Sequence, residues 1–238
     1  MTPGRTITVA AAFNGPQESG NGGYACGLVA QALGGRAEVS LRSPVPLEVP
    51  LRLEPGPGGE PDTVELRDGE VLVAEARRSD GLRLEVPAPV DPATARRVAA
   101  GYRGAQEGVF SHCFVCGRAR QDSLGVFAGE VAGRELLASP WTPPAWTAGA
   151  AGAVRPELVW AVLDCPNYFA SYHGREPALA FLVRASVEID APVASGEEHV
   201  VIAWPLRVEG RKRFAGSALL SAGGEVLARC EAMLVEPR

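Results

Sequence analysis

Residues 36–45, RAEVSLRSPV, and residues 184–193, RASVEIDAPV, carry one ten-residue pattern with five identical positions. A second repeated stretch follows each copy: GEVL occurs at residues 69–72 and again at residues 224–227. The first pair is offset by 148 residues and the second by 155. The two copies therefore differ by an insertion of seven residues.

Copies of this length indicate a duplicated domain, since solenoids and propellers repeat at intervals of roughly 20–50 residues. A Glu-Ala pair also closes both runs, at residues 75–76 and 231–232. Chance similarity in a chain rich in Ala, Gly, Val and Arg is the alternative, but the common order and spacing favour duplication. We therefore predict two domains, residues 1–90 and 109–238, joined by a linker helix within residues 91–108. Paired domains bury a pseudo-twofold interface, and clefts at such interfaces often hold small molecules.

Composition limits the classes of protein to consider. The length of 238 residues suits one large or two ordinary domains, and 46% hydrophobic residues can supply real cores. The net charge of −5 implies no broad basic field, so we expect no nucleic-acid partner. Neither a secretory signal nor an apolar run of bilayer length is visible, so we expect no membrane partner. Five cysteines, an odd number, fit a reducing cytoplasm better than a disulfide framework.

Hydrophobic periodicity predicts one long buried helix followed by antiparallel strands in each half. The helix of the first half is expected at residues 24–33, closed by two glycines. The helix of the second half is expected at residues 156–168, and Pro166 should end or kink it. Strands are predicted at residues 6–13, 37–41, 47–53, 63–66, 71–76, 124–131, 135–139, 179–189, 198–204, 214–220 and 226–235, with a short helix at residues 93–101 between the halves.

Local motifs are similar to those of hotdog-fold proteins, in which a curved antiparallel sheet wraps one long helix. CFVCG at residues 113–117, followed by Leu-Gly at residues 124–125, resembles the opening of hotdog thioesterases of the phenylacetic-acid-pathway type, which carry Gly-Leu there. Residues 22–33, GGYACGLVAQAL, resemble the first helix of type II acyl-CoA thioesterases, and residues 216–231 resemble that family's last hairpin. Together with the duplication, the resemblance implies an α+β fold of two tandem (double) hotdog units.

The resemblance also implies a reaction. Hotdog thioesterases use a carboxylate on one long helix to activate water or attack the thioester, while backbone N–H groups at the start of a partner helix hold the thioester oxygen. Asp164 matches that acid, and Gly22 and Gly23 match the glycines of the opposing helix start. Two departures concern hydrolysis. AVRP at residues 153–156 replaces the usual His-Gly-Gly, and the Gln near the end of type II enzymes has no clear counterpart around residues 230–231.

Asp164 is the sharpest candidate that the residues themselves provide. It lies on an apolar helix, where an unpaired buried carboxylate is costly unless it has a partner or a function. Burial would raise its pKa and favour a role in proton transfer. The alternative is a structural Asp that hydrogen-bonds the backbone before Pro166. Asn167 and Tyr168 follow one turn later, either to orient a ligand or the carboxylate or as ordinary helix-end residues.

Asn21, Gly22, Gly23 and Tyr24 open the first predicted helix. Glycines let the backbone approach a ligand, and free N–H groups at a helix start favour developing negative charge. We therefore expect the N–H groups of Gly23 and Tyr24 to form an oxyanion site, with Asn21 and Gly22 binding the substrate beside them. The alternative is a flexible loop with Asn21 as the helix cap.

Two further groups are candidates for substrate binding. Arg211 and Arg213 flank Lys212 in a predicted hairpin turn, where they could meet the phosphates of coenzyme A unless the turn is simply solvated. Trp141 precedes the second helix and could either wall an acyl pocket or cap the core.

Cys113 and Cys116 have the spacing of half a zinc site. No second Cys-x-x-Cys or His pair completes it, so a pair of small buried hydrophobes is favoured, with a redox pair as a further alternative. We expect no metal and no cofactor. The sequence also has no serine nucleophile elbow, phosphate loop or dinucleotide fingerprint.

These observations predict one function and one alternative. We expect hydrolysis of an acyl-CoA-type thioester in a cleft between two hotdog halves, in the cytoplasm. Exposed sheet edges could pair two such chains into a homodimer of double hotdogs. A non-catalytic hotdog protein that binds acyl-CoA or a small ligand is the alternative, because a fold does not fix a function.

Overall fold

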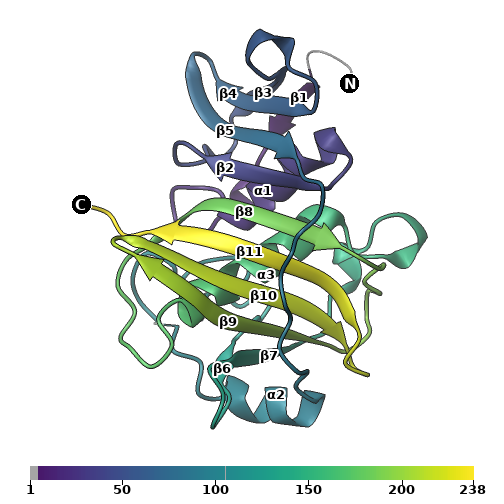
Figure 1. Ribbon diagram of the computed structural model, residues 1–238, viewed down its shortest axis with the longest axis vertical. Helices are drawn as coiled ribbons and strands as arrows, with labels where there is room; N and C mark the ends of the chain where they lie inside the picture. Colours follow the sequence, from purple (N-terminus) through teal and green to yellow (C-terminus); the bar gives the residue numbers. More distant parts are fainter. Residues whose placement is uncertain (1–4, 105) are drawn as a thin grey trace.

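The computed structural model describes residues 5–104 and 106–238, and one antiparallel sheet within them has eleven strands. The strand order is β1-β3-β4-β5-β2-β8-β11-β10-β9-β7-β6, so the two halves of the chain lie side by side in a continuous sheet (Figure 1). The strands are β1 (Arg5–Thr8), β2 (Ala37–Leu41), β3 (Pro50–Pro55), β4 (Thr63–Asp68), β5 (Val71–Arg78), β6 (Gly129–Glu130), β7 (Leu137–Trp141), β8 (Phe181–Ile189), β9 (His199–Glu209), β10 (Lys212–Ser221) and β11 (Val226–Val235).

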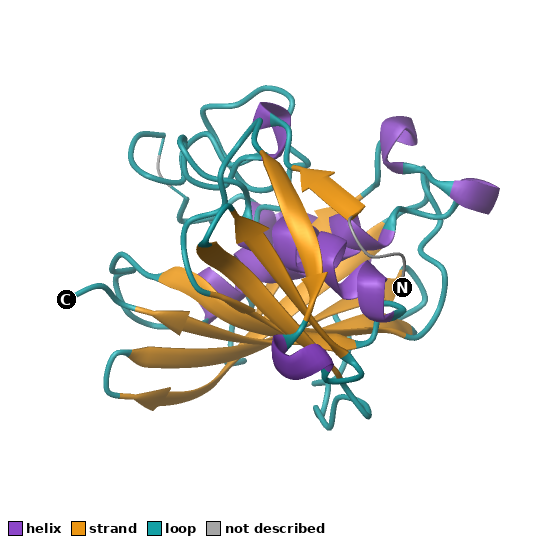
Figure 2. Ribbon diagram, turned by 90° about the horizontal axis from the view of Figure 1, so that it is seen from above, coloured by secondary structure: helices purple, strands orange, loops and turns teal. Residues whose placement is uncertain are grey.

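The α-helices of the described residues are α1 (Gly22–Ala30), α2 (Pro92–Ala99) and α3 (Pro156–Ala170). Helices α1 and α3 pack against each other and lie within the curve of the sheet (Figure 2). Short 3-10 turns occur at Ala11–Phe13, Gln31–Leu33, Pro57–Gly59, Ala145–Thr147 and Ala150–Gly152. None of the helices in the described ranges combines the length and hydropathy that crossing a bilayer requires.

Strands β2 and β8 join the two halves of the sheet. Each strand contains the beginning of one copy of the repeated pattern. Ala37 pairs with Val187, and Val39 pairs with Ala185, in antiparallel register. The two copies of the repeat therefore lie next to each other in the middle of the sheet.

Side-chain alternation explains how the sheet covers α3. In β11 every second residue from Ala228 to Leu234 is buried, and these residues share one core with the helix. Three of the four, Ala228, Cys230 and Ala232, are small, so the helix can approach the sheet closely. α3 is buried on nearly every side because the sheet and α1 enclose it.

Glycines on α1 determine how closely the two central helices cross. A Cβ atom at Gly23 would lie 2.5 Å from the Cβ atom of Asp164 and 2.7 Å from the carbonyl oxygen of Trp160. A Cβ atom at Gly27 would lie 2.6 Å from the Cα atom of Glu157. Real side chains do not make contacts this short, so the two backbones approach at a distance that only glycine allows.

The connection between the halves crosses the outer face of the sheet. After β5, residues 79–90 run as extended chain over the second half of the sheet to α2 (Figure 1). Leu84 and Val86 from this segment join Ala95 of α2 in a second apolar cluster, which includes Ile202 of β9. α2 also packs on β6 and β7, so the helix expected between the two domains contacts the second half of the sheet.

The strand predicted at residues 124–131 is largely wrong. Only Gly129–Glu130 pairs with a neighbour, as the short strand β6. Leu124 and Val126 are buried, but their N–H groups bond to carbonyl groups at residues 114 and 115 of an adjoining loop. The apolar alternation in this segment therefore reflects burial of a loop and not pairing in the sheet.

Pro166 does not end α3, which continues four residues beyond it to Ala170. The Leu163 carbonyl, near the proline, accepts a hydrogen bond of 2.8 Å from the Asn167 side chain. It accepts a second one of 2.7 Å from Ser217 on β10. Pro166 removes the N–H that would bond to the carbonyl four residues earlier, that of Val162. The two bonds to the neighbouring Leu163 carbonyl therefore anchor this turn of the helix but do not replace the lost one.

We expect Gly27→Ala to destabilise the protein by about 1–3 kcal/mol, the usual cost of forcing extra volume into a packed core. The new methyl group would meet the α3 backbone at Glu157, which cannot move aside as the end of a side chain can. Urea unfolding followed by circular dichroism measures the change. Gly223→Ala is the matched control, because a Cβ there meets nothing closer than 3.7 Å. Equal losses of stability in both variants would contradict the close helix crossing.

Candidate active site

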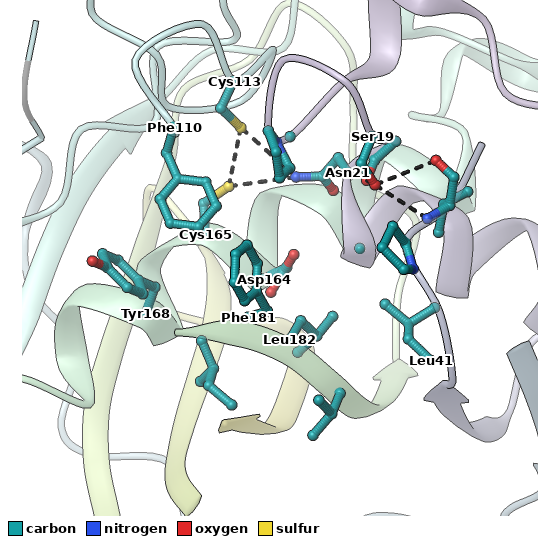
Figure 3. A pocket seen from close by; sticks show the side chains of 18 of the residues that line it. Ser19, Asn21, Leu41, Phe110, Cys113, Asp164, Cys165, Tyr168, Phe181 and Leu182 are labelled. Atoms are coloured by element: carbon teal, nitrogen blue, oxygen red, sulfur yellow. Dashed lines mark hydrogen bonds between the residues drawn. The ribbon is translucent and has the colours of Figure 1, made fainter. Parts of the chain in front are cut away.

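A cavity of about 550 Å³ lies where α3, the start of α1 and the end of β2 meet (Figure 3). The first half of the chain contributes residues 18–22 and 41–45 to its lining. The second half contributes residues 180–183 and side chains from α3 and from the loop at residues 110–116. The cavity is therefore formed jointly by both halves, and most of its lining is apolar.

Asp164 is a buried acidic residue on the α3 side of this cavity (Figure 3). Its Oδ2 atom accepts a hydrogen bond of 2.9 Å from the backbone N–H of Gly23. Burial raises the pKa of Asp164 to about 7, although the Gly23 N–H opposes the shift and Cys113 adds to it. The carboxyl group thus bonds across to α1, and not to the backbone before Pro166 as its structural alternative required.

The start of α1 faces Asp164, and two of its N–H groups already have acceptors. Asn21 caps the helix as expected, since its Oδ1 accepts a hydrogen bond of 2.9 Å from the N–H of Tyr24. The Gly23 N–H is held by Asp164. The Gly22 N–H has no hydrogen-bond acceptor among residues 5–104 and 106–238, and Gly22 lines the cavity. Of these three donors, Gly22 is the one available to a ligand.

Tyr168 and Asn167 lie on different sides of α3. Tyr168 lines the cavity, and its hydroxyl donates to the carbonyl of Ala178 at 3.0 Å. Asn167 is fully buried toward the sheet, where its amide also donates to the hydroxyl of Ser217 at 3.1 Å. Its Oδ1 has no partner in the described part of the chain. Asn167 therefore supports the helix near the proline and does not reach the cavity.

The side chains of Tyr24 and Trp141 lie outside the cavity. Tyr24 stacks on Phe13 with ring centroids 4.3 Å apart, and burial raises its pKa to about 12. Trp141 is buried on β7, with its ring 6.2 Å from that of His199. Both aromatic rings fill the core, so neither is placed to contact a ligand in the cavity.

The two arginines proposed to meet coenzyme A phosphates also lie away from the cavity. Arg213 forms an ion pair with Glu236 at 2.6 Å and lies 4.0 Å over the ring of Tyr172. Arg211 donates to the Glu236 carbonyl at 2.7 Å. These contacts hold the chain end against α3 and β10, which explains a cationic turn without a ligand.

Several cavity residues carried no signal in the sequence analysis. Phe110 contributes a ring 5.4 Å from that of Tyr168 and 5.9 Å from that of Phe181. Leu41 and Leu182 line the opposite wall (Figure 3). Leu41 belongs to the repeated pattern, but no sequence feature shows that its strand ends beside Asp164.

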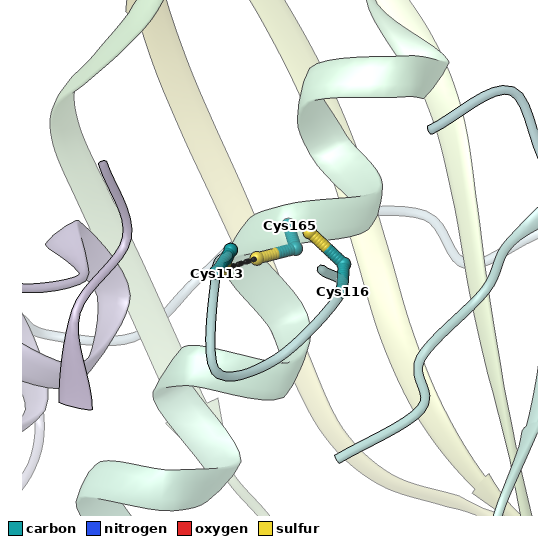
Figure 4. A group of neighbouring side chains, drawn as sticks. All are labelled: Cys113, Cys116 and Cys165. Atoms are coloured by element: carbon teal, nitrogen blue, oxygen red, sulfur yellow. Dashed lines mark hydrogen bonds between the residues drawn. The ribbon is translucent and has the colours of Figure 1, made fainter. Parts of the chain in front are cut away.

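Cys113, Cys116 and Cys165 form a cluster in which all sulfur atoms lie within 4.8 Å of one another (Figure 4). Hydrogen bonds with the thiols of Cys116 and Cys165 lower the pKa of the Cys113 thiol. Hydrogen bonding to Cys113 raises the pKa of the other two thiols. The first two cysteines were visible as a motif, whereas Cys165 was not linked to them because it lies 49 residues further along the chain.

Comparison with known proteins supports the fold. No protein-family profile matches the sequence, and no curated protein matches it. A protein from Novosphingobium aromaticivorans DSM 12444, named provisionally as a thioesterase, aligns over 99% of this chain and 96% of its own, with TM-score 0.63 and 14% identity. A hot dog fold protein of unknown function from Alicyclobacillus acidocaldarius aligns over 99% and 94%, with TM-score 0.61 and 13% identity. The tesB protein of Mycobacterium avium subs paratuberculosis aligns over 91% and 87%, with TM-score 0.59 and 13% identity.

These alignments extend over nearly the whole of each chain, so the chain has the hotdog fold of these structures. The resemblance noted in the sequence is thereby confirmed at the level of the fold. Identities of 13–14% carry no information on substrate or activity.

We expect Asp164→Asn to be more stable than the wild type at pH 8, by roughly 1–4 kcal/mol. A neutral amide avoids the cost of burying a charge, and its oxygen still accepts from the Gly23 N–H. Because folding raises the pKa of Asp164 from 3.8 to about 7, the native carboxyl favours its proton, and the wild type loses stability as pH rises through this window. The two proteins should therefore differ least near pH 4. Calorimetric unfolding measures this, and a less stable variant at pH 8 would refute it.

Proposed function

We propose that this protein hydrolyses an acyl-CoA-type thioester in the cavity between its two halves. The proposal rests on one observation, that Asp164 meets the glycine-rich start of α1 at a shared cavity. Thioester hydrolysis needs a group that takes a proton or attacks the carbonyl, and a group that binds developing negative charge. The names of two neighbouring structures, a tesB protein and a provisional thioesterase, are consistent with this chemistry.

Asp164 acts as the general base or as the nucleophile. Its Oδ2 is held by Gly23, which leaves Oδ1 for a water molecule or for the thioester carbonyl carbon. As a base, the carboxylate takes a proton from water while the water oxygen attacks that carbon. The C–S bond then breaks, the new acid leaves, and the proton passes to the departing thiolate.

The Gly22 N–H holds the thioester oxygen in this proposal, in place of the N–H groups of Gly23 and Tyr24. It is the first N–H of α1, where the helix dipole adds partial positive charge. Asn21 fixes its position by capping the helix. Gly23 takes a different role, because its N–H orients the carboxylate.

The cavity lining favours an apolar acyl group. Its volume of about 550 Å³ is that of a small-molecule site, and Phe110, Phe181 and Leu182 supply apolar walls. Arg42 lines the cavity itself, with its side chain half exposed and paired with Glu75. It is therefore a better candidate than Arg211 or Arg213 to meet a phosphate of the carrier.

We further propose that the chain is a tandem duplication of one hotdog unit, with domains at residues 1–90 and 109–238. The two halves have matching element orders, β1-α1-β2-β3-β4-β5 and β7-α3-β8-β9-β10-β11. The strand order of the sheet is correspondingly symmetric about the β2–β8 pair, except that β6 at one edge has no counterpart at the other. In that pair Ala37 faces Val187 and Val39 faces Ala185, the reciprocal register that a pseudo-twofold axis requires.

The repeated GEVL and Glu-Ala stretches support the duplication only in part. Both GEVL runs lie at hairpin turns, where Val71 begins β5 and Val226 begins β11. The Glu-Ala pairs occupy non-equivalent positions, because Ala76 pairs with Val39. Ala232 pairs with Ala185, which is the counterpart of Ala37 and not of Val39.

A duplication implies two related sites, and the residues favour one of them. Asp164 lies eight residues into α3, and the residue eight positions into α1 is Ala30. Next to it, Gln31 donates a hydrogen bond of 2.8 Å to Glu157 at the start of α3. This pair is the counterpart of the Asp164–Gly23 contact. It joins two side chains, whereas the proposed site joins a carboxylate to a backbone N–H group.

The cellular location and the oligomeric state of the protein stay predictions. All five cysteines are free thiols, which supports our proposal of a reducing cytoplasmic location. Strands β1 and β6 are the edges of the sheet and are the proposed contacts of a homodimer.

We expect Asp164→Ala to reduce kcat at least 100-fold toward any acyl-CoA that the wild type hydrolyses, since it removes the proton acceptor. Release of free thiol across a panel of acyl-CoA chain lengths measures the rate. Glu157→Gln is the matched control, because it neutralises the buried carboxylate of the counterpart contact between Gln31 and Glu157 and should leave kcat within about twofold. Equal rates for wild type and Asp164→Ala, or ligand binding without turnover by the wild type, would reject catalysis by Asp164.

We expect Gly22→Pro to lower kcat by about 100-fold relative to Gly22→Ala, the usual effect of losing one oxyanion donor. Proline is tolerated at the first position of a helix and removes the N–H. Asn21 has φ −62° and ψ 131°, a conformation that accepts a following proline. Gly22→Ala adds the same Cβ, with contacts of 3.0–3.2 Å to Leu182 and Leu41, but keeps the donor. Similar rates for the two variants would exclude this N–H as the oxyanion donor.

A further inference from the structure

Three buried thiols converge beside the cavity from two separate parts of the chain (Figure 4). Cys113 and Cys116 belong to the loop that opens the second half, and Cys165 follows Asp164 on α3. The sulfur atoms of Cys113 and Cys165 are 3.6 Å apart, and all three lie within 4.8 Å of one another. The proposed hydrolysis assigns none of these thiols a role.

The loop at residues 113–117 is shaped to present its two thiols. The Gly117 N–H donates to the Cys113 carbonyl at 2.8 Å and closes the turn. A Cβ atom at Gly117 would lie 2.5 Å from the Ser111 carbonyl oxygen, so only glycine fits there. The Tyr102 hydroxyl fixes the loop from outside through a bond of 2.9 Å to the Cys116 carbonyl.

The spacing of the Cys113 and Cys165 thiols suits a shared metal ion better than a disulfide. Thiolates bind Zn²⁺ at about 2.3 Å, so tetrahedral ligands have sulfur atoms about 3.8 Å apart. A disulfide needs about 2.05 Å. The separation of 3.6 Å between Cys113 and Cys165 is close to the first value and far from the second.

Asn21 supports the same cluster from the first half of the chain. Its Nδ2 atom lies 3.7 Å from the sulfur of Cys113 and 3.7 Å from that of Cys165 (Figure 3). Hydrogen bonds from outer groups to metal-bound thiolates orient the ligands and stabilise their charge. The amide oxygen of the same side chain caps α1, so the cluster and the start of α1 share one residue.

We propose that Cys113, Cys116 and Cys165 bind one thiophilic divalent metal ion of the Zn²⁺ class. Each thiol releases one proton when its sulfur becomes a ligand, so binding releases three protons. Three protein ligands leave one position of a tetrahedral site to a water molecule or another small donor. All three thiols line the cavity, so this position opens onto it. The site does not depend on the proposed hydrolysis and is tested without measuring activity.

Cobalt(II) titration of the reduced, tag-free full-length protein tests the proposal. We expect one equivalent of Co²⁺ to produce the near-ultraviolet absorption of thiolate-to-cobalt charge transfer, and Zn²⁺ to abolish it by displacement. Cys113→Ala and Cys165→Ala should each weaken binding at least 100-fold. Cys26→Ala is the matched control and should bind as the wild type does, because Cys26 is equally buried but lies on α1 outside the cluster.

A second measurement uses the wild type alone and covers the case in which a cysteine variant fails to fold. One equivalent of Zn²⁺ should protect Cys113, Cys116 and Cys165 from alkylation, as mass spectrometry maps it residue by residue. Absence of the charge-transfer band, unchanged binding in a folded Cys113→Ala or Cys165→Ala protein, or no protection by Zn²⁺ would each overturn the proposal.

Discussion

The crossing of α1 and α3 positions the carboxyl group and the backbone donors of the candidate site. Gly23 brings the α1 backbone so close to α3 that its N–H reaches the Asp164 carboxylate at 2.9 Å. This bond supplies the buried carboxyl with a partner and fixes its orientation. A side chain at Gly23 would separate the helices, and the carboxyl would lose its donor while the cavity changed shape. The packing of the helices and the chemistry of the site thus both depend on the absence of a side chain at Gly23.

The crossing also explains why the site belongs to both halves of the chain. The acid comes from α3, whereas the cap and the free N–H come from the start of α1. The β2–β8 pairing holds the halves in register, and the strand ends that follow it supply Leu41 and Leu182 to the cavity. Neither half encloses the cavity by itself.

The sequence predicted strands correctly where apolar alternation arises from a sheet with one face buried. The strands at residues 37–41 and 226–235 coincide with β2 and β11, because alternation there reports a sheet with one face on the core. It failed at residues 124–131, where a buried loop produces the same alternation without pairing. It also ended α3 two residues early, since the helix accommodates Pro166 and continues to Ala170.

The candidate site was predictable in its groups but not in its details. Asp164 and the glycines of α1 were visible because a carboxyl on an apolar helix and a glycine-rich helix start are locally unusual. The sequence could not show which N–H group of α1 stays free. That depends on the hydrogen bonds that Asp164 accepts from the Gly23 N–H and Asn21 accepts from the Tyr24 N–H. Arg211 and Arg213 have the charge that a phosphate needs, yet the carbonyl of Glu236 accepts from Arg211 and its carboxylate pairs with Arg213.

A crystal structure of Asp164→Asn with a non-hydrolysable thioester analogue tests the assignment of the cavity. Our account predicts that the carbonyl oxygen lies within about 3.2 Å of the Gly22 nitrogen, a normal hydrogen-bond length, with the carbonyl carbon facing residue 164. The acyl group should lie against Phe110, Phe181 and Leu182. An analogue bound elsewhere, or bound here with its carbonyl turned away from α1, would contradict the account.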